Sequence, residues 1–504
     1  MSSHDTIVIG AGLAGLRCAT RLADAGRDVV VLEAGDAVGG RERTDLVDGF
    51  RLDRGFHVLN PAYPAVQRAV DIDALDLRRF PVAVGVRLGG STDRAEQGPS
   101  RSRDPRTPAG PTDAAEQEPS RSRDPRTPAG STDAAEQEPS RSRDPRAPAR
   151  PTDAAEQEPS SGTPPTRATV AHLAHPLRHP GRIIETLRSG LVCPGDLVAL
   201  ARWAAPAILA PQAATRGPDR PLSEGWDRAG LRGPLRESVL EPFLAGVIAD
   251  DRQQTSDAFV RLLIRSFALG RPGLPADGIG ALPAQLAATA RRAGAGIRLS
   301  HRVTEVHRTG RSWRVEIEGG DAVSARTVVF ATGLAAPIAG LDLAPPRTRG
   351  LQTWWFATDE APSDDAALRV DGRPLPAGGT GRRPGPVVNT SVLTRTVPSY
   401  APAGQHLVHA TCLLPGTDGP ATEADVRRQL ADLWDADVAA WRLLRRDDIP
   451  DALPAQDPPL RARRPVRLGD GRYVAGDHRD TASIQGALVS GERTARAVLA
   501  DPVR

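Results

Sequence analysis

The residues with the clearest chemical signature lie near the start of the chain, in TIVIGAGLAGLRCATRLADAGRDVVVLEA, residues 6–34. Gly10, Gly12 and Gly15 form a GxGxxG motif, and Glu33 follows at the spacing of an acid that binds a ribose. The first glycine permits a tight turn, the second lets a pyrophosphate approach the backbone, and the third lets the helix pack against the strand. This pattern predicts dinucleotide binding, with Glu33 accepting hydrogen bonds from the adenosine ribose.

A strand, a helix and a second strand must surround these glycines. Residues 7–9 and 29–32 are apolar runs typical of buried strands, and the residues after Gly12 have helical spacing. The amides at the start of such a helix face the phosphates, where the helix dipole also favours negative charge. A coincidental glycine-rich turn, the alternative, does not explain why all these elements occur in register.

Other motifs resemble those of a known family. AGDAVGGRERT and FRLDRGFH follow Glu33, and YVAGDHRDTASIQGALVSGERTARAVL lies near the carboxyl terminus. Together they resemble the flavin amine oxidase and phytoene desaturase superfamily, which binds FAD through a GGR motif after the first unit and a GD motif before the last helix. The middle agrees more loosely, through EPFLAGVIAD, GLPADGIGALPAQLA and VVFATG. The resemblance implies an FAD-dependent oxidoreductase.

The resemblance also implies roles for single residues. Gly39, Gly40 and Arg41 would bind the FAD diphosphate, the backbone of Val303 would meet the adenine, and Asp477 would bind a ribityl hydroxyl. Independently, Ser483 is expected to begin a helix whose positive end stabilises negative charge on the reduced flavin. The predicted cofactor-binding residues are Gly10, Gly12, Leu13, Ala14, Gly15, Glu33, Ala34, Gly39, Gly40, Arg41, Gly55, Val303, Gly476, Asp477, Ile484, Gln485 and Ala487.

The way the cofactor is attached and recycled follows from what else the chain contains. No cysteine lies in the terminal motif, so FAD is expected to be non-covalent. GAGIRL at Gly294 and GDGRYV at Gly469 lack the third glycine, so no second site for NADPH is visible. The flavin is therefore expected to be reduced by the substrate and reoxidised by oxygen, a quinone or another acceptor.

The substrate prediction rests on a missing residue type. All 65 basic residues are arginines. Flavin amine oxidases commonly place a lysine near the flavin and two aromatic rings around the amine, whereas this chain has no lysine and has Ser483 where one ring lies. ASIQGALVSG resembles the ending of carotenoid desaturases and squalene-pathway flavoenzymes. We therefore expect dehydrogenation of an apolar, isoprenoid or carotenoid-like substrate.

Two alternatives stay open. One is an amine oxidase without the usual lysine, in which an arginine could have taken over that role. The other is a non-catalytic carrier or interaction protein, because the Rab escort and dissociation-inhibitor proteins share this fold without redox chemistry. The intact Glu33, GGR and GD set argues against the second.

Few side chains are expected to take part in a desaturase reaction, since the flavin performs the redox step. His57 follows Arg54, Gly55 and Phe56, at the position where the chain in members of this superfamily passes beside the isoalloxazine ring of FAD. It is the one candidate catalytic residue, and its expected role is that of a proton relay. A packed structural histidine is the alternative for His57 and for His478. The aromatic run at 354–356, Trp354, Trp355 and Phe356, could wall a substrate pocket, but a core strand is the more common interpretation.

Two further segments have competing interpretations. His172, His175 and His179 have a spacing that could suggest a metal, but prolines interrupt the segment and no acid or thiol lies close, so no metal site is expected. Residues 197–214 could form an amphipathic helix at a membrane surface where a lipophilic substrate enters, although a core helix is favoured. Peripheral membrane contact is thus a secondary expectation.

Length and composition set the organisation. Residues 93–164 repeat a 20-residue unit such as DAAEQEPSRSRDPRTPAGST, whose only aliphatic side chain is alanine, so they predict a disordered insertion rather than a solenoid. The predicted fold is α/β, with a Rossmann-like, discontinuous FAD-binding domain of the GR2 type and an inserted α+β substrate domain. The expected segments are 1–88, 276–340 and 463–504 for FAD, 167–275 and 341–462 for substrate, and 89–166 for the repeats.

Secondary structure between these motifs is also predicted. Alternating valines at 82–88 and the residues 168–173 should pair as strands on either side of the repeats. Residues 196–290 are mostly helical, and the apolar runs 297–299, 303–306 and 313–317 should form a small antiparallel set before a buried strand at 327–331.

Charge and cysteine usage exclude other classes. The net charge of +3 arises from interspersed residues and aromatics make up only 4%, so nucleic-acid binding is not expected. Three isolated cysteines and no signal-peptide pattern favour a reducing, cytoplasmic location.

Overall fold

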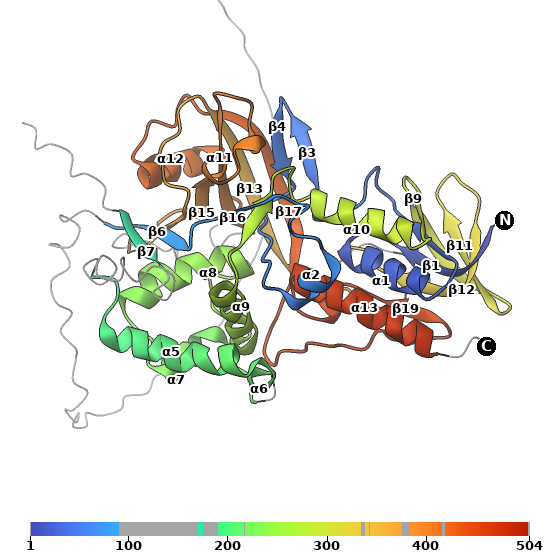
Figure 1. The fold of residues 1–504 in the computed structure, drawn as a ribbon. Helices are drawn as coiled ribbons and strands as arrows, with labels where there is room; N and C mark the ends of the chain where they lie inside the picture. The colour runs from blue at the N-terminus through green and yellow to red at the C-terminus, as the bar shows by residue number, and fades with distance from the viewer. Residues whose placement is uncertain are drawn as a thin grey trace, which may run out of the picture. The chain divides into compact units, whose positions relative to one another are not determined.

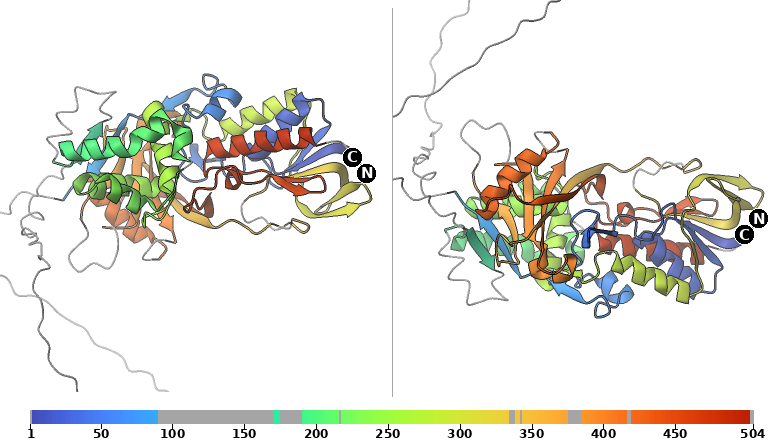
Figure 2. Two further views of the ribbon diagram at one scale, coloured as in Figure 1. Left: turned by 90° about the horizontal axis from the view of Figure 1, so that it is seen from below. Right: turned by 90° about the horizontal axis from the view of Figure 1, so that it is seen from above.

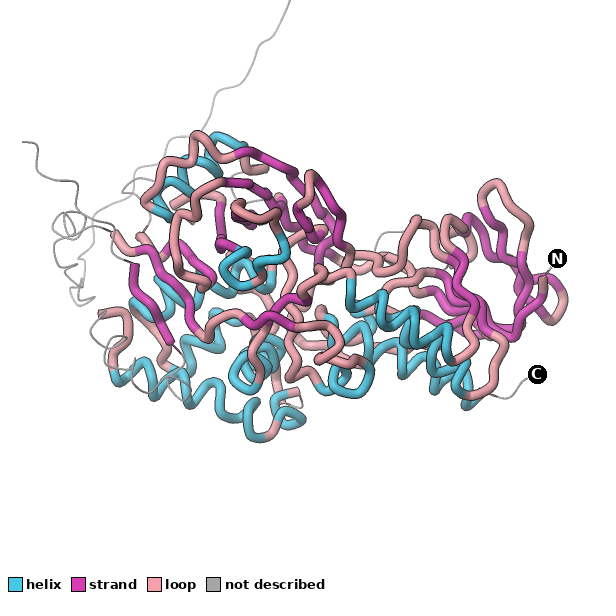
Figure 3. The backbone as a smooth tube through the Cα atoms, turned by 45° about the horizontal axis from the view of Figure 1, so that its top comes forward, coloured by secondary structure: helices cyan, strands magenta, loops and turns pink. Residues whose placement is uncertain are grey.

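The computed structural model describes residues 2–89, 170–174, 190–215, 217–333, 338–341, 343–374, 384–415 and 419–501, which are coloured in Figure 1. These residues belong to one structural unit, and the predicted repeat array at 93–164 lies outside them. Figure 3 shows the strands of the two large sheets as two separate groups, with helices beside each.

The first sheet has eight strands and contains the predicted nucleotide-binding unit. Its order is β10-β11-β12-β1-β2-β9, with β19 pairing β12 and β18. β1 lies parallel to both β2 and β12, as expected for a βαβ unit with a crossover helix. The strands are β1 (Ser3–Ile9), β2 (Val29–Leu32), β9 (Gly296–Arg298), β10 (Val303–Thr309), β11 (Ser312–Ile317), β12 (Val323–Phe330), β18 (Arg467–Gly469) and β19 (Arg472–Val474).

One strand assignment needs correction. The apolar run at 297–299 was expected to join the antiparallel set, but β9 pairs in parallel with β2 at the edge of the sheet. The helix α10 (Ala281–Arg292) precedes β9 and delivers it to that edge by a crossover connection, which favours parallel pairing. Only β10 and β11, together with the first half of β12, form the antiparallel set.

Three helices cover this sheet. α1 (Leu13–Asp24) lies between α10 and α13 (Ile484–Ala500), as Figures 1 and 2 show. Its buried face includes Leu16, Ala19 and Ala23, at the three-and-four spacing of an amphipathic helix. On α13 the predicted apolar face is buried at Leu488 and Val498. The first and last helices of the chain thus pack together and form one core with the sheet.

The second sheet has seven strands in the order β17-β13-β16-β15-β14-β6-β7. β6 and β7 pair antiparallel, which confirms the strand pairing predicted on either side of the repeats. β6 belongs to the segment 1–88 that was expected in the FAD-binding domain, yet it pairs in this second sheet. The strands are β6 (Ala83–Arg87), β7 (Val170–Ala174), β13 (Thr348–Thr358), β14 (Leu368–Asp371), β15 (Val387–Val392), β16 (His406–Leu414) and β17 (Arg442–Pro454).

Helices lie on both faces of the second sheet. α8 (Glu241–Ile248) packs against β14 and β15 on one face, and α12 (Glu423–Trp434) packs against the same strands on the other (Figure 1). Among the described residues, no helix is long and apolar enough to cross a membrane. The remaining helices are α2 (Pro64–Ala69), α5 (Pro194–Leu209), α6 (Pro211–Ala214), α7 (Leu222–Ala229), the π-helix Leu235–Leu240, α9 (Asp257–Leu269), α11 (Leu393–Thr396) and the 3₁₀ helices Pro398–Tyr400 and Asp477–Arg479. The remaining strands are β3 (Thr44–Val47), β4 (Phe50–Asp53), β5 (Leu77–Arg79) and β8 (Gly273–Pro275).

Candidate functional site

A single cavity of about 1380 Å³ joins the glycine-rich turn after β1 to the helices beside the second sheet. This volume exceeds the roughly 300–1,000 Å³ of an ordinary ligand pocket. Its lining includes the residues after β1, the segment after β2, the turn before α13, and apolar residues of α5, α8 and α9. The cavity therefore has room for a large cofactor together with a substrate.

The glycines of the GxGxxG motif differ in what surrounds them. Gly10 has a φ of +105°, and a Cβ there would lie 2.5 Å from the carbonyl oxygen of Ala331. A Cβ on Gly15 would lie 2.0 Å from the carbonyl oxygen of Gly10, so this glycine lets α1 pack against the turn. Gly12 lines the cavity and a Cβ there would meet no atom within 4 Å. Open space in front of its backbone is what a diphosphate requires.

Glu33 lies directly after β2 and lines the same cavity. Its carboxylate accepts hydrogen bonds from the backbone amides of Ala11 at 2.6 Å and Gly35 at 2.8 Å. These contacts orient the carboxylate toward the turn. A carboxylate has about four lone-pair sites, so capacity remains for two ribose hydroxyls.

Arg41, which lines the cavity, connects its own segment with the segments of Ala452 and Asp477. Its Nη2 donates to Asp477 Oδ2 at 2.7 Å, and its Nη1 donates to the carbonyl oxygen of Ala452 at 2.5 Å. Asp477 is buried, so this ion pair lies in a weakly screened environment. The pair places the GGR motif beside the GD motif.

The carboxyl of Glu42, next to Arg41, also lines the cavity. Burial raises the pKa of Glu42 to about 7, with Asp477 adding to the rise and Arg41 opposing it. This acid was missed by the sequence reasoning, although its place directly after GGR was a usable signal.

The start of α13 also lines this cavity. Ser483 caps the helix by accepting from the amide of Gly486 at 3.1 Å, and Ser483, Ile484 and Ala487 line the cavity. Gln485 does not line it: its Oε1 accepts from the amide of Ala65, because this first-turn position faces α2. The amide end of a 17-residue helix therefore borders the cavity where negative charge would be favoured.

Most predicted cofactor residues converge on this cavity. Gly15 and Gln485 are the exceptions. Gly15 packs against the turn that follows β1, and Gln485 contacts α2. Those that line it are Gly10, Gly12, Leu13, Ala14, Glu33, Ala34, Gly39, Gly40, Arg41, Gly55, Val303, Gly476, Asp477, Ile484 and Ala487. The open space before Gly12, an acid at the ribose position and an arginine at the diphosphate position together fit FAD.

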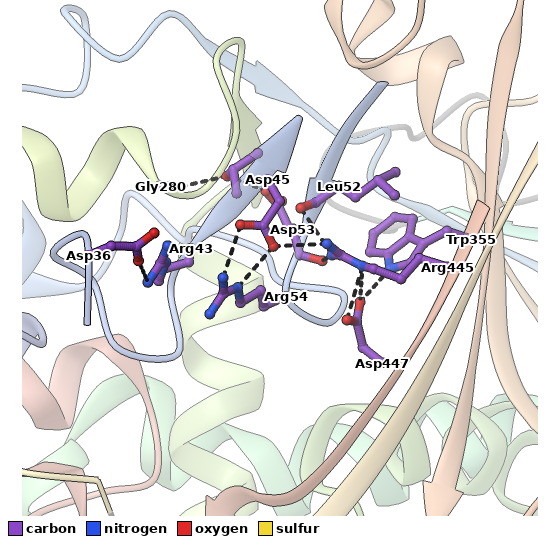
Figure 4. A network of polar contacts seen from close by, with 11 residues as sticks. Asp36, Arg43, Asp45, Leu52, Asp53, Arg54, Gly280, Trp355, Arg445 and Asp447 are labelled. Carbon is purple, nitrogen blue, oxygen red and sulfur yellow. Dashed lines mark hydrogen bonds and ion pairs between the residues drawn. The ribbon is translucent and has the colours of Figure 1, made fainter. Parts of the chain in front are cut away.

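The segment that carries His57 follows the β3–β4 hairpin, which a polar network joins to the second sheet (Figure 4). Arg445 on β17 donates to Asp45 at 2.8 Å and forms an ion pair with Asp447 at 3.0 Å. Asp45 also accepts both guanidinium contacts of Arg54, at 2.9 and 3.1 Å. Arg445 further donates to the carbonyl oxygens of Leu52 and Asp53. The network therefore positions residues 54–57 relative to β17.

His57 lines the cavity and its ring orientation is defined. Nδ1 lies 2.9 Å from the carbonyl oxygen of Gly55, which can only accept, so Nδ1 carries the proton and Nε2 keeps its lone pair. Burial lowers the pKa of His57, and the nearby Asp53 opposes this effect. His57 is thus a neutral imidazole among the residues that line the cavity.

The apolar part of the cavity, here called the chamber, is lined by α5, the π-helix, α8, α9 and strands of the second sheet. Among the residues that the structure describes, the charged ones that line the whole cavity are Glu33, Arg41, Glu42, Arg54, Arg302 and Asp477, and none of them comes from these elements. Chamber residues include Leu200, Ala204 and Ile208 of α5, Phe243 and Val247 of α8, Leu263, Ile264 and Phe267 of α9, and Leu351, Leu368 and Ile449 of the sheet.

Several residues weighed from the sequence lie outside the cavity. Trp354, Trp355 and Phe356 are buried in core clusters, so the core interpretation is confirmed. His478 is also buried away from the cavity lining. His175 and His179 lie outside the described residues, and among those described no cluster of potential metal ligands occurs.

Comparisons with known proteins agree with this geometry. The model of the family described as flavin-containing amine oxidoreductase matches residues 13–179 and 209–499. A carotenoid 3,4-desaturase from Haloarcula japonica is 49% identical over 55 residues, which is 11% of each chain. A putrescine oxidase from Kocuria rosea is 46% identical over 68 residues, 14% of each chain.

Solved structures show the same fold over nearly the whole chain. An oxidoreductase from Methanosarcina mazei covers 98% of this chain and 100% of its own, with a TM-score of 0.60 and 15% identity. A putrescine oxidase bound to putrescine covers 99% of each chain, with a TM-score of 0.55 and 15% identity. The curated sequence relatives, by contrast, match over a small fraction of their length.

Proposed function

The chain belongs to the family of flavin-containing amine oxidoreductases, and from that premise we propose that it dehydrogenates an apolar, isoprenoid or carotenoid-like substrate. Membership makes the chain an FAD-dependent oxidoreductase, which removes the non-catalytic alternative. The single observation that carries the proposal is the chamber, whose walls come from α5, α8, α9 and the second sheet and contribute no charged side chain. An ammonium group would lose its hydration there without gaining a carboxylate.

Each region of the site has a task in this proposal. FAD, when bound, supplies the oxidant that accepts a hydride from a substrate carbon. Glu33, the amides after Gly12 and the Arg41–Asp477 pair hold the cofactor, and the first turn of α13 favours the negative charge that reduction creates. Desaturation also releases a proton from the neighbouring carbon, and Nε2 of His57 accepts it.

Anaerobic reduction of the bound flavin tests the proposal. The purified holoenzyme is mixed with a panel of polyenes, squalene derivatives and amines, and the visible flavin absorbance is followed. We expect bleaching by an apolar polyene and none by putrescine or other amines. Bleaching by amines alone, with release of peroxide in air, would establish the amine oxidase alternative. The similarity to a putrescine oxidase is the reason to include amines in the panel. For the reoxidation step we propose oxygen or a quinone, distinguished by adding each to the reduced enzyme.

We also propose that α5 touches a lipid surface. Leu197, Val198 and Leu209 are 37%, 59% and 83% exposed, while Leu200 and Ile208 of the same helix line the chamber. An apolar substrate would then enter from the bilayer without crossing water. Co-sedimentation with vesicles of neutral and anionic phospholipid should fall when Val198 and Leu209 are both changed to Glu. Unchanged sedimentation would remove the proposal.

A further inference from the structure

One polar side chain in the chamber is not explained by cofactor binding. Asn389 lies on β15, is only 3% exposed, and lines the cavity among apolar residues. A buried amide without partners is costly, so the contacts of both its ends matter.

One end of the amide is held by a histidine. Asn389 Oδ1 lies 3.1 Å from Nε2 of His409, and Nδ1 of the same ring lies 3.0 Å from the hydroxyl of Ser391. With an amide oxygen facing Nε2, that nitrogen carries the proton and the Ser391 hydroxyl donates to Nδ1. Burial lowers the pKa of His409 to about 3, so the ring stays neutral. Phe56 stacks on it at 4.0 Å between ring centroids.

The other end of the amide faces the chamber. Within the described residues, Nδ2 of Asn389 has no hydrogen-bond partner, and the residue lines the cavity beside Gly246. The pairing of β15 with β16 shifts register between Val387 and Asn389, and such irregularities redirect side chains. As a result Val388 and Asn389 both approach Gly246, although neighbours on a regular strand point to opposite faces.

Gly246 on α8 leaves the space that this orientation needs. A Cβ at that position would lie 2.1 Å from Nδ2 of Asn389 and 3.1 Å from the side chain of Val388. The irregularity in β15, the glycine at position 246 and the hydrogen bonds from Ser391 through His409 together hold Nδ2 of Asn389, a hydrogen-bond donor, in an otherwise apolar chamber.

We propose that Asn389 is a specificity-determining residue, and that the apolar substrate carries a carbonyl or hydroxyl oxygen that accepts a hydrogen bond from its Nδ2. A site built to bind such an oxygen discriminates against the analogue that lacks it, because the donor is then left unpaired. Phe56, which stacks on His409, directly precedes His57, the proposed base, in the chain. This inference rests on the proposed function for its apolar substrate class.

Ligand binding tests the inference without requiring turnover. The FAD-loaded wild type and the Asn389→Leu variant are titrated with methyl heptyl ketone and with nonane, and perturbation of the flavin absorbance gives the dissociation constants. The ketone can only accept hydrogen bonds. We expect Asn389→Leu to weaken ketone binding about tenfold, equivalent to about 1.4 kcal/mol, and to leave nonane binding unweakened. Equal effects on both probes, no effect on the ketone, or a ketone that does not bind the wild type would overturn the inference.

A second variant covers the case in which Asn389→Leu does not fold, since it leaves Nε2 of His409 unpaired. Gly246→Ala retains the amide but forces Nδ2 to move, so it should also weaken the ketone selectively. Anaerobic bleaching is measured separately. If no polyene reduces the flavin while the ketone preference depends on Asn389, the proposed function fails and the recognition of oxygen stands. If a polyene reduces the flavin but the preference for the ketone is absent, the recognition of oxygen by Asn389 fails and the proposed function stands.

Discussion

Alanine substitutions at Gly12 and Gly15 separate cofactor contact from packing within one motif. The backbone at Gly12, with φ −73° and ψ 176°, suits alanine, and its Cβ would touch nothing in the protein alone. Gly12→Ala should therefore leave the apoprotein as stable as the wild type, or raise its free energy of unfolding by about 0.4–1 kcal/mol. In the holoenzyme the methyl group would occupy the space where the diphosphate approaches the backbone.

The expected loss of affinity follows from the contacts that the methyl group displaces. One charge-assisted hydrogen bond contributes about 1.5–3 kcal/mol, so the dissociation constant for FAD should rise about 10- to 100-fold. Gly15→Ala differs because its Cβ would overlap the carbonyl oxygen of Gly10 at 2.0 Å. Although alanine favours helices by about 1 kcal/mol over glycine, this overlap with backbone should destabilise the apoprotein by about 1–3 kcal/mol.

Two assays separate these effects: titration of apoprotein with FAD by fluorescence quenching, and denaturant unfolding of the apoprotein. Gly12→Ala should weaken FAD binding without destabilising the apoprotein, whereas Gly15→Ala should destabilise the apoprotein. If Gly12→Ala binds FAD as tightly as the wild type, the diphosphate does not approach this turn. If it unfolds as readily as Gly15→Ala, the open space before Gly12 has been misinterpreted.

Three further substitutions test the electrostatics of the site. Glu42→Gln should raise the free energy of unfolding of the apoprotein at pH 8 but not at pH 4. A carboxyl whose pKa is about 7 in the folded state and 4.5 in the unfolded state makes the protein less stable as the pH rises through that range, and glutamine removes this effect. Denaturant titrations at both pH values check the prediction. His57→Gln should slow flavin reduction about 10²- to 10⁴-fold and abolish the fall in rate that the wild type shows below the lowered pKa of His57. The control variant His406→Gln, at a half-buried histidine away from the cavity, should keep the wild-type dependence of the rate on pH. If the rate of His57→Gln still falls at low pH as in the wild type, His57 is not the base. Arg445→Met should lower the free energy of unfolding by about 2–4 kcal/mol, because it leaves Asp447 without its cation; a loss below about 0.5 kcal/mol by denaturant unfolding would show the network to be dispensable.

The nucleotide-binding half could be predicted from the sequence because its constraints are local. A turn that must hold Gly10 at positive φ and keep Gly15 free of a Cβ requires these residues wherever it occurs. The neighbours of β9 could not be predicted in the same way. An apolar run of a few residues has the same pattern beside any partner, and the connection through α10 decides which edge it joins.

The chamber was harder to predict, since its walls come from segments far apart in the chain. Asn389 illustrates the difficulty: its side chain points into the chamber because of an irregularity in strand pairing, which no residue pattern specifies. A weak signal did exist. The run VVNTSV places three polar residues in a strand whose six positions are all buried, and buried polar groups need partners or a purpose. Domain boundaries stay predictions, and β6 is the strand of segment 1–88 that pairs in the other sheet.

The absence of lysine can now be related to the arginines of the site. Three arginines line the cavity in the described regions of the chain, and each has an acidic partner. Arg41 pairs with Asp477, Arg54 with Asp45 and Arg302 with Glu318. A guanidinium held in this way is always charged and has no lone pair, so none of the three can replace an amine as a proton acceptor. Among the residues that line the cavity, His57 keeps the lone pair of Nε2, because its Nδ1 donates to the carbonyl oxygen of Gly55. We therefore propose that a reaction at this site that needs a base uses the histidine, an assignment that suits removal of a proton from carbon better than the handling of a charged amine.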